Sequence, residues 1–228
     1  MKASSSFGTC ELCESTFSKA AMARHLVGCK QAGPAAIRPG IGQAGDSFHL
    51  LIEGRCQKDY WLHLALPMRS PLKKLDGFLR DIWLECCGHL SAFEIAGERY
   101  DINPDDEDSI GPKPHSMNVP AGQVLRVGAT FSHEYDFGST TELILKVVGL
   151  RGTDGQRRGI TLLARNNAPK IPCDGCKTGE PASQVCSDCQ WHGQGWLCKE
   201  CAKTHKCGLD MLLPLVNSPR VGVCGYTG

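Results

Sequence analysis

Cysteine is the residue type that most constrains this chain. The 228 residues include 14 cysteines, and eight of them stand in Cys-x-x-Cys pairs. Paired thiols at this spacing, with histidine nearby, are typical of metal ligation, whereas a disulfide framework is typical of small secreted domains. The first ten residues, MKASSSFGTC, contain no apolar segment that would act as a secretory signal. We therefore expect reduced, metal-binding cysteines and a cytoplasmic location.

The first group of ligands stands near the N-terminus. Cys10, Cys13, His25 and Cys29 follow the pattern C-x2-C-x11-H-x3-C. A tight turn between the first two can bring both thiolates to one tetrahedral ion. His25 and Cys29, four residues apart, share one face of a helix. The stretch resembles a C2HC zinc finger of the ββα type, and we assign residues 1–30 to it.

This finger has a small predicted core and few basic residues. Phe17 and Leu26 are placed to pack beneath the helix, while Ala23 stands where such fingers usually carry a large core residue. Three cations, Lys19, Arg24 and Lys30, could contact phosphate. A single finger, however, reads only about three base pairs, and the net charge of +1 argues against bulk electrostatic binding of nucleic acid. A structural or protein-contacting finger is the favoured interpretation.

Two segments of the chain contain part of a known ligand-binding motif but lack other features that the motif requires. Residues 31–45 are rich in Gly, Ala and Pro and are predicted to be a linker. They contain Gly40-x-Gly42-x-x-Gly45, but no strand precedes this motif and no helix follows it, so we reject a dinucleotide site. The acidic segment 101–109 lacks the glycine and the closing glutamate of a calcium loop and is predicted to be an exposed loop.

Residues 46–168 are predicted to form an α+β domain. Leu72, Leu75, Leu79 and Trp83 recur at helical spacing within residues 71–86, which predicts one main amphipathic helix. Apolar and β-branched runs predict the strands, at residues 48–54, 60–66, 89–95, 124–137, 141–150 and 160–168. Strands in runs with one helix favour a mixed or antiparallel central sheet, flanked here by small zinc-stapled modules.

The central domain is similar to the plasmid open-reading-frame-three-like family. The resemblance rests on the leucine-rich helix, on HLxxFxIxGxxY at residues 89–100 and on YDFG at residues 135–138. It covers about 120 residues. This family also occurs as a passenger of insertion elements, under the label TnpR. The resemblance implies an α+β domain and no established activity. In the family an acid, a tryptophan and a histidine often follow YDFG, but here STTELIL follows, so a site built from those side chains would be missing.

No catalytic motif stands out in the central domain, and we predict no catalytic residues. His49, His63, His89 and His133 are scattered and are expected to be structural. Cys56, Cys86 and Cys87 are expected to serve no metal. In the polar cluster at residues 133–136, His133 and Tyr135 share one strand face, and Glu134 and Asp136 share the other. This cluster is the place where a pocket would be sought.

The C-terminal segment, residues 169–228, contains the strongest metal signal. Three further Cys-x-x-Cys pairs precede a histidine and another cysteine, which supplies eight ligands for two closed tetrahedral zinc sites. The ligands are Cys173, Cys176, Cys186, Cys189, Cys198, Cys201, His205 and Cys207. Because one residue alone separates His205 from Cys207, Cys224 is an alternative to Cys207. His192 is a weaker candidate.

The order of these pairs resembles cross-brace modules of the B-box, MYND and RING types. That resemblance implies that Cys173, Cys176, Cys198 and Cys201 share one zinc, and that Cys186, Cys189, His205 and Cys207 share the other. Sequential pairing, as in a zinc ribbon, remains the alternative. Together with the finger, this predicts about three Zn²⁺ ions per chain.

Three functions are compatible with the sequence. The leading hypothesis is a non-catalytic zinc-binding protein that mediates protein or nucleic-acid contacts. One alternative is a DNA-associated accessory protein of a mobile element, acting through the finger. The other is an enzyme with a pocket in the central domain and purely structural zincs. A protein partner is expected and nucleic acid is an option, whereas a membrane is not, because no apolar run is long enough to span one.

Overall fold

The computed structural model describes residues 6–31, 37–38, 47–104, 113–152, 159–176 and 178–228. It divides into two compact units. The first comprises Met1–Leu79 and Leu90–Asn167, and the second comprises Arg80–His89 and Ala168–Gly228. The glycine motif at residues 40–45 and residues 105–109 of the acidic segment lie outside the described residues.

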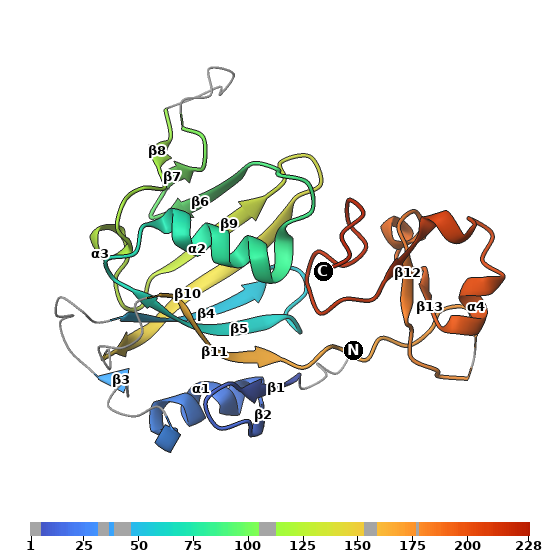
Figure 1. Ribbon diagram of the computed structural model, residues 1–228, viewed down its shortest axis with the longest axis horizontal. Coiled ribbons are helices and arrows are strands. Elements are labelled where there is room, and N and C mark those ends of the chain that lie inside the picture. The colour runs from blue at the N-terminus through green and yellow to red at the C-terminus, as the bar shows by residue number, and fades with distance from the viewer. Residues whose placement is uncertain (1–5, 32–36, 39–46, 105–112, 153–158, 177) are drawn as a thin grey trace. The chain divides into compact units, whose positions relative to one another are not determined.

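One large sheet forms the first unit (Figure 1). Its strands are β1 (Phe7–Cys10), β2 (Thr16–Ser18), β3 (Ile37–Arg38), β4 (Ser47–Gly54), β5 (Trp61–Pro67), β6 (Ser91–Ile95), β7 (Glu98–Asp101), β8 (His115–Ser116), β9 (Thr130–Tyr135), β10 (Thr141–Arg151) and β11 (Thr161–Asn166). They lie in the order β2-β1-β11-β5-β4-β10-β9-β6-β7-β8, and β3 pairs with β10. Among the described strands of this sheet, β7 and β8 make the one parallel pair.

Three helices accompany the sheet: α1 (Lys19–Gly28), α2 (Leu72–Leu79) and α3 (Ala121–Val124). Helix α2 lies across one face of the sheet (Figure 1) and buries Leu72, Leu75 and Leu79. The predicted α+β class, with an antiparallel sheet and one main amphipathic helix, is confirmed. In the described part of the chain, no helix has the length and apolar character needed to cross a membrane.

Two predicted elements have different boundaries in the structure. The helix predicted over residues 71–86 is α-helical only to Leu79 and continues as the π-helical turn η2 (Arg80–Leu84), where Glu85 N–H donates to the Arg80 carbonyl at 2.9 Å. The strand predicted over residues 124–137 begins only at Thr130. Val124 ends α3 instead, and a turn that hydrogen-bonds Gly128 to Val147 precedes β9.

The N-terminal finger is part of the large sheet. Strand β1 pairs with β2 on one side and with β11 on the other, with Gly8 opposite Asn166 and Cys10 opposite Ala164. Residue 8 must be glycine, because a Cβ there would overlap the Arg165 carbonyl oxygen and the Trp61 ring. The finger is therefore fixed to the sheet along a full strand.

The small core of the finger merges with the core of the sheet. Met22 and Leu26 of α1 are fully buried and belong to one cluster with Trp61, Leu163 and Ala164, against which Phe17 packs. Met22, rather than residue 23, thus supplies the large side chain of the helix. The sheet provides most of the apolar surface that an isolated finger lacks.

The second unit contains a small three-stranded sheet in the order β13-β12-β14. Its elements are the 3-10 turns η3 (Cys189–His192) and η4 (Leu209–Met211), the strands β12 (Gln184–Cys186), β13 (Trp196–Leu197) and β14 (Leu212–Pro214), and the helix α4 (Lys199–Lys203). Its buried apolar residues between the cysteines are Ala182, Val185, Leu197 and Ala202. So few apolar side chains form only a minimal core.

Candidate metal centres

Among the described residues, four groups of Cys and His side chains could each hold a metal ion. In every group the candidate ligand atoms all lie within 4.8 Å of one another. A tetrahedral zinc ion would place two sulfur ligands about 3.8 Å apart, and sulfur and nitrogen about 3.6 Å apart. The groups are Cys10/Cys13/His25/Cys29, Cys86/Cys87/His89/Cys224, Cys173/Cys176/Cys198/Cys201 and Cys186/Cys189/His205/Cys207.

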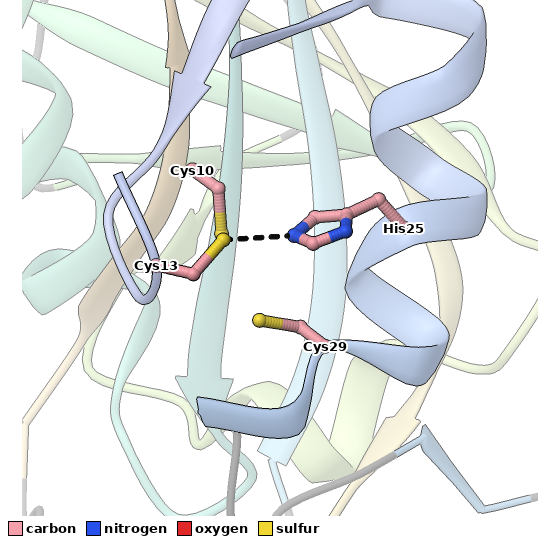
Figure 2. A group of neighbouring side chains, drawn as sticks. All are labelled: Cys10, Cys13, His25 and Cys29. Atoms are coloured by element: carbon pink, nitrogen blue, oxygen red, sulfur yellow. Dashed lines mark hydrogen bonds between the residues drawn. The ribbon is translucent and has the colours of Figure 1, made fainter. Parts of the chain in front are cut away.

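The finger group is assembled by the hairpin and by helix α1. Cys10 ends β1, Cys13 lies in the turn before β2, and His25 and Cys29 come from the end of the helix (Figure 2). Their side chains converge, with Cys13 Sγ 3.3 Å from His25 Nε2. The ring of Phe17 stacks on the His25 imidazole, at 4.0 Å between centroids, and fixes its orientation.

The pKa shifts of the finger cysteines run in opposite directions, because burial raises the pKa of the Cys10 thiol to about 11. A hydrogen bond from the Ser15 side chain lowers the pKa of the Cys13 thiol to about 6. Arg151 is buried beside the group and donates from Nη1 to the Leu26 carbonyl at 3.1 Å. Burial lowers the pKa of Arg151, and the charges of Cys29 and Cys10 oppose this shift. Three thiolates with a divalent ion carry one net negative charge, which this guanidinium balances.

The C-terminal pairs alternate between two groups. The first and third pairs, Cys173/Cys176 and Cys198/Cys201, meet in one group. The second pair, Cys186/Cys189, meets His205 and Cys207 in the other. Cys189 Sγ lies 3.5 Å from His205 Nε2 and 3.6 Å from Cys207 Sγ. Of the two pairings that the spacing allows, the structure has the interleaved, cross-brace arrangement.

Backbone amides stabilise the thiolate form of the first cysteine in each C-terminal group. Cys173 Sγ accepts hydrogen bonds from the backbone N–H groups of Gly175 and Cys198, at 3.3 and 3.2 Å. Partial burial raises the pKa of Cys173, but these donors outweigh it and hold that pKa at about 6. In the same way the pKa of Cys186 is about 7, because backbone donors that include Cys189 N–H outweigh partial burial. Thiolate is the form that binds metal.

The structure places some of the remaining candidate metal ligands in a group and others outside the groups. Cys207 completes the second C-terminal group, whereas Cys224 lies with Cys86, Cys87 and His89. The expectation that Cys86 and Cys87 serve no metal group therefore does not match their placement. His192 and Cys56 are exposed, and neither belongs to any of the groups found among the described residues. The signal for the missed group was the short motif Cys-Cys-x-His at residues 86–89, together with the unmatched Cys224.

The face of the expected polar cluster that carries His133 and Tyr135 is buried. His133 is fully buried in β9, where its Nε2 donates to Asp76 Oδ1 of α2 at 2.8 Å and its ring lies against Phe93. Tyr135 on the same strand is also fully buried. These side chains join the helix to the sheet and present no face to solvent.

Two further buried histidines contact each other on the opposite face of the sheet. His49 Nε2 and His63 Nδ1 are 2.9 Å apart, on adjacent strands β4 and β5. Alternation along these strands places both rings on the side of Leu51 and Ala65, which pack against the finger core. Burial, with smaller contributions from His63 and Arg151, lowers the pKa of His49 to about 2. Burial, with Lys19 and Arg151, lowers that of His63 to about 4.

We expect this pair to make stability depend on pH. The unfolded chain binds protons on both imidazoles as pH falls below about 6.5, while the folded chain does not, so stability decreases from about pH 6.5 toward pH 4. Each imidazole contributes about 1.4 kcal/mol per pH unit in that window. NMR of ¹⁵N-histidine-labelled protein measures this directly, and both rings should remain neutral at pH 5.5. A titration of either ring centred near 6.5 would contradict their burial.

Fold and site together define an α+β protein with four Cys/His groups of metal-binding geometry. No protein-family model matches the chain, and no curated protein matches it. A matching solved structure is the crystal structure of a protein of unknown function from Methanosarcina mazei Go1, with 16% sequence identity and a TM-score of 0.44. The match covers 57% of this chain and 74% of that one. It assigns no role to any residue.

Proposed function

We propose that this protein is a non-catalytic zinc-binding interaction protein. The observation that carries the proposal is that each Cys/His group supplies four protein ligands. A zinc ion held by four side chains has no open position for water or substrate, so it acts structurally. Cysteine-rich sets with imidazole select zinc over hard cations such as Mg²⁺ and Ca²⁺. Reduced thiolates also suit a cytoplasmic location.

The exposed apolar residues of the C-terminal module support a protein partner. Trp191 and Leu209 expose 64% and 68% of their surface, and Met211 exposes 36%. Trp191 lies two residues after Cys189, and Leu209 lies two residues after Cys207. These two cysteines belong to the same group, and their sulfurs are 3.6 Å apart. Tryptophan and methionine are enriched at protein interfaces, and the zinc ion would hold both segments in place.

The finger supports nucleic-acid recognition less well. In ββα fingers the third and sixth helical residues contact bases, and here they are Ala21 and Arg24 of α1. Alanine has no hydrogen-bonding side chain. Lys19 forms an ion pair with Glu53 and donates to the Lys58 carbonyl, so its charge is used within the protein. The likeness of residues 46–168 to the plasmid family is part of the proposal, and so is a role in a mobile element. Neither changes the preference for a protein partner over nucleic acid.

Site-specific photo-crosslinking tests the proposal. Zinc-loaded protein carrying a photoreactive amino acid in place of Trp191 should form adducts in cells whose size nuclease does not change. The matched control carries the same group at Glu98, an exposed charged residue of the large sheet. Adducts at position 191 that nuclease shortens would favour the nucleic-acid alternative. Equal labelling at both positions, or the absence of zinc from freshly purified reduced protein, would contradict the proposal.

A further inference from the structure

The group of Cys86, Cys87, His89 and Cys224 has the dimensions of a metal site. All four residues belong to the second unit. Cys87 Sγ lies 3.5 Å from Cys86 Sγ, 2.9 Å from His89 Nε2 and 3.8 Å from Cys224 Sγ. His89 Nε2 is 3.4 Å from Cys224 Sγ. Apart from the short Cys87–His89 contact, these separations are close to the edges of a zinc tetrahedron.

The local backbone is shaped to bring these ligands together. Residues 86–89 follow the π-helical turn η2, and Gly88 adopts φ +79°, a conformation that other residues rarely take. Gly88 N–H donates to Glu85 Oε1 at 2.6 Å, which closes the turn that returns His89 toward Cys87. Cys224 itself has φ +50°. A non-glycine residue in this region is strained, and binding to a metal would offset that strain.

The C-terminal tail is independently attached to the same segment. Ser218 Oγ donates to the Trp83 carbonyl at 2.6 Å, and Arg220 N–H donates to Ser218 Oγ at 2.9 Å. The backbone of Val223 then hydrogen-bonds to Arg220, and that of Tyr226 to Val223. Cys224 therefore reaches the group at the end of an ordered, largely buried tail.

A buried arginine provides matching charge. Two arginines are buried among the described residues, Arg151 and Arg220. Arg151 lies beside the Cys₃His group of the finger, and Arg220 donates from Nη2 to Cys86 Sγ at 3.4 Å. Three thiolates around a divalent ion leave one negative charge, and a buried guanidinium needs such a partner. The same combination of Cys₃His ligands and a buried arginine thus occurs twice in this chain.

We propose that Cys86, Cys87, His89 and Cys224 form a fourth zinc site, which ties the C-terminal tail to residues 80–89. Binding of Zn²⁺ releases the three thiol protons to solvent and forms three Zn–S bonds and one Zn–N bond. Arg220 is the positioning residue that orients Cys86 and balances the charge. This site shares the zinc chemistry of the proposed function but requires no partner, so either proposal can fail alone.

Native mass spectrometry of the full chain tests the count of bound ions. The wild-type protein should bind four zinc ions, one for each group. The double variant Cys87→Ser/Cys224→Ser should bind three, and the control Cys56→Ser, which removes an exposed cysteine outside the groups, should still bind four. Three ions in wild type and double variant alike would overturn the fourth site. No zinc at all would overturn the proposed function as well.

Thiol alkylation of the wild-type protein tests the site without any variant. Cys56, Cys87 and Cys224 are all exposed, so an alkylating reagent can reach each of them. Coordination should slow alkylation of Cys87 and Cys224, so a zinc chelator should raise their rates by at least about tenfold and leave the rate of Cys56 unchanged. Rates at Cys87 and Cys224 that the chelator leaves unchanged would overturn the proposal. Reactivity that appears only after a reductant would also overturn it, because it would show a disulfide instead.

Discussion

Removing zinc should unfold the C-terminal module, residues 168–228, while the central strands of the large sheet stay folded. Apart from its cysteines, the module buries few apolar side chains, among them Val185, Leu197 and Ala202. Binding of a structural zinc contributes about 10–16 kcal/mol to folding, far more than this small core can supply. Hydrogen-exchange mass spectrometry with and without a chelator should show complete loss of protection in β12, β13 and α4, and little change in β4, β5 and β10.

Two variants that each remove one cysteine distinguish the loss of a metal ligand from the loss of a thiol elsewhere in the chain. Cys198→Ser removes one ligand of the cross-brace and should unfold the module even in excess zinc. Cys56→Ser also removes one thiol, but outside the groups found in the described chain, and should leave exchange unchanged. A module that remains protected in chelator would show that its fold does not depend on metal.

Loss of the Asp76 carboxylate should destabilise the first unit by about 3 kcal/mol, because it leaves a buried hydrogen-bond donor without its acceptor. Asp76 and His133 are both buried, and their side chains are 2.8 Å apart. In Asp76→Ala the Nε2 proton of His133 would lose its acceptor between α2 and β9. Urea unfolding monitored by the hydrogen-exchange protection of β4 and β5 measures the change in the first unit.

The exposed pair His115–Glu98 of the first unit is the control for this prediction. Its atoms are 3.2 Å apart, but both side chains are largely exposed, at 57% and 64%. Solvent screening makes such pairs worth about 0.5 kcal/mol or less, so Glu98→Gln should scarcely change stability. Similar effects from the two substitutions would show that burial does not strengthen the Asp76–His133 contact.

Local spacing predicted much of the architecture. The α+β class and the amphipathic helix followed from residues that recur at fixed intervals, such as Leu72, Leu75 and Leu79. Three proposed ligand sets could likewise be read from Cys-x-x-Cys pairs, since a turn of two residues decides where both sulfurs point. The choice between alternate and sequential pairing could not be derived from spacing, because it depends on how the small sheet folds.

Long-range pairing was beyond the sequence. His89 and Cys224 are 135 residues apart, so nothing local shows that they meet. The attachment of the finger was hidden for the same reason, because the pairing of Cys10 with Ala164 joins opposite ends of the first unit. A linker at residues 31–45 suggested an independent finger. Gly8 was the one local sign of that contact in the sequence, because the ring of Trp61 leaves no room for a side chain at this position.

The strand pairing of the finger also determines how the large sheet ends. Strand β11 would be an edge strand if β1 and β2 did not cover it, and its backbone groups would be open to pairing with another molecule. Instead the sheet ends at one side in the three residues of β2 and at the other in the two residues of β8. Such short edges resist strand addition. A metal ion bound by Cys10, Cys13, His25 and Cys29 would stabilise β1, β2 and α1, and would thereby also protect the protein against aggregation at this edge of the sheet.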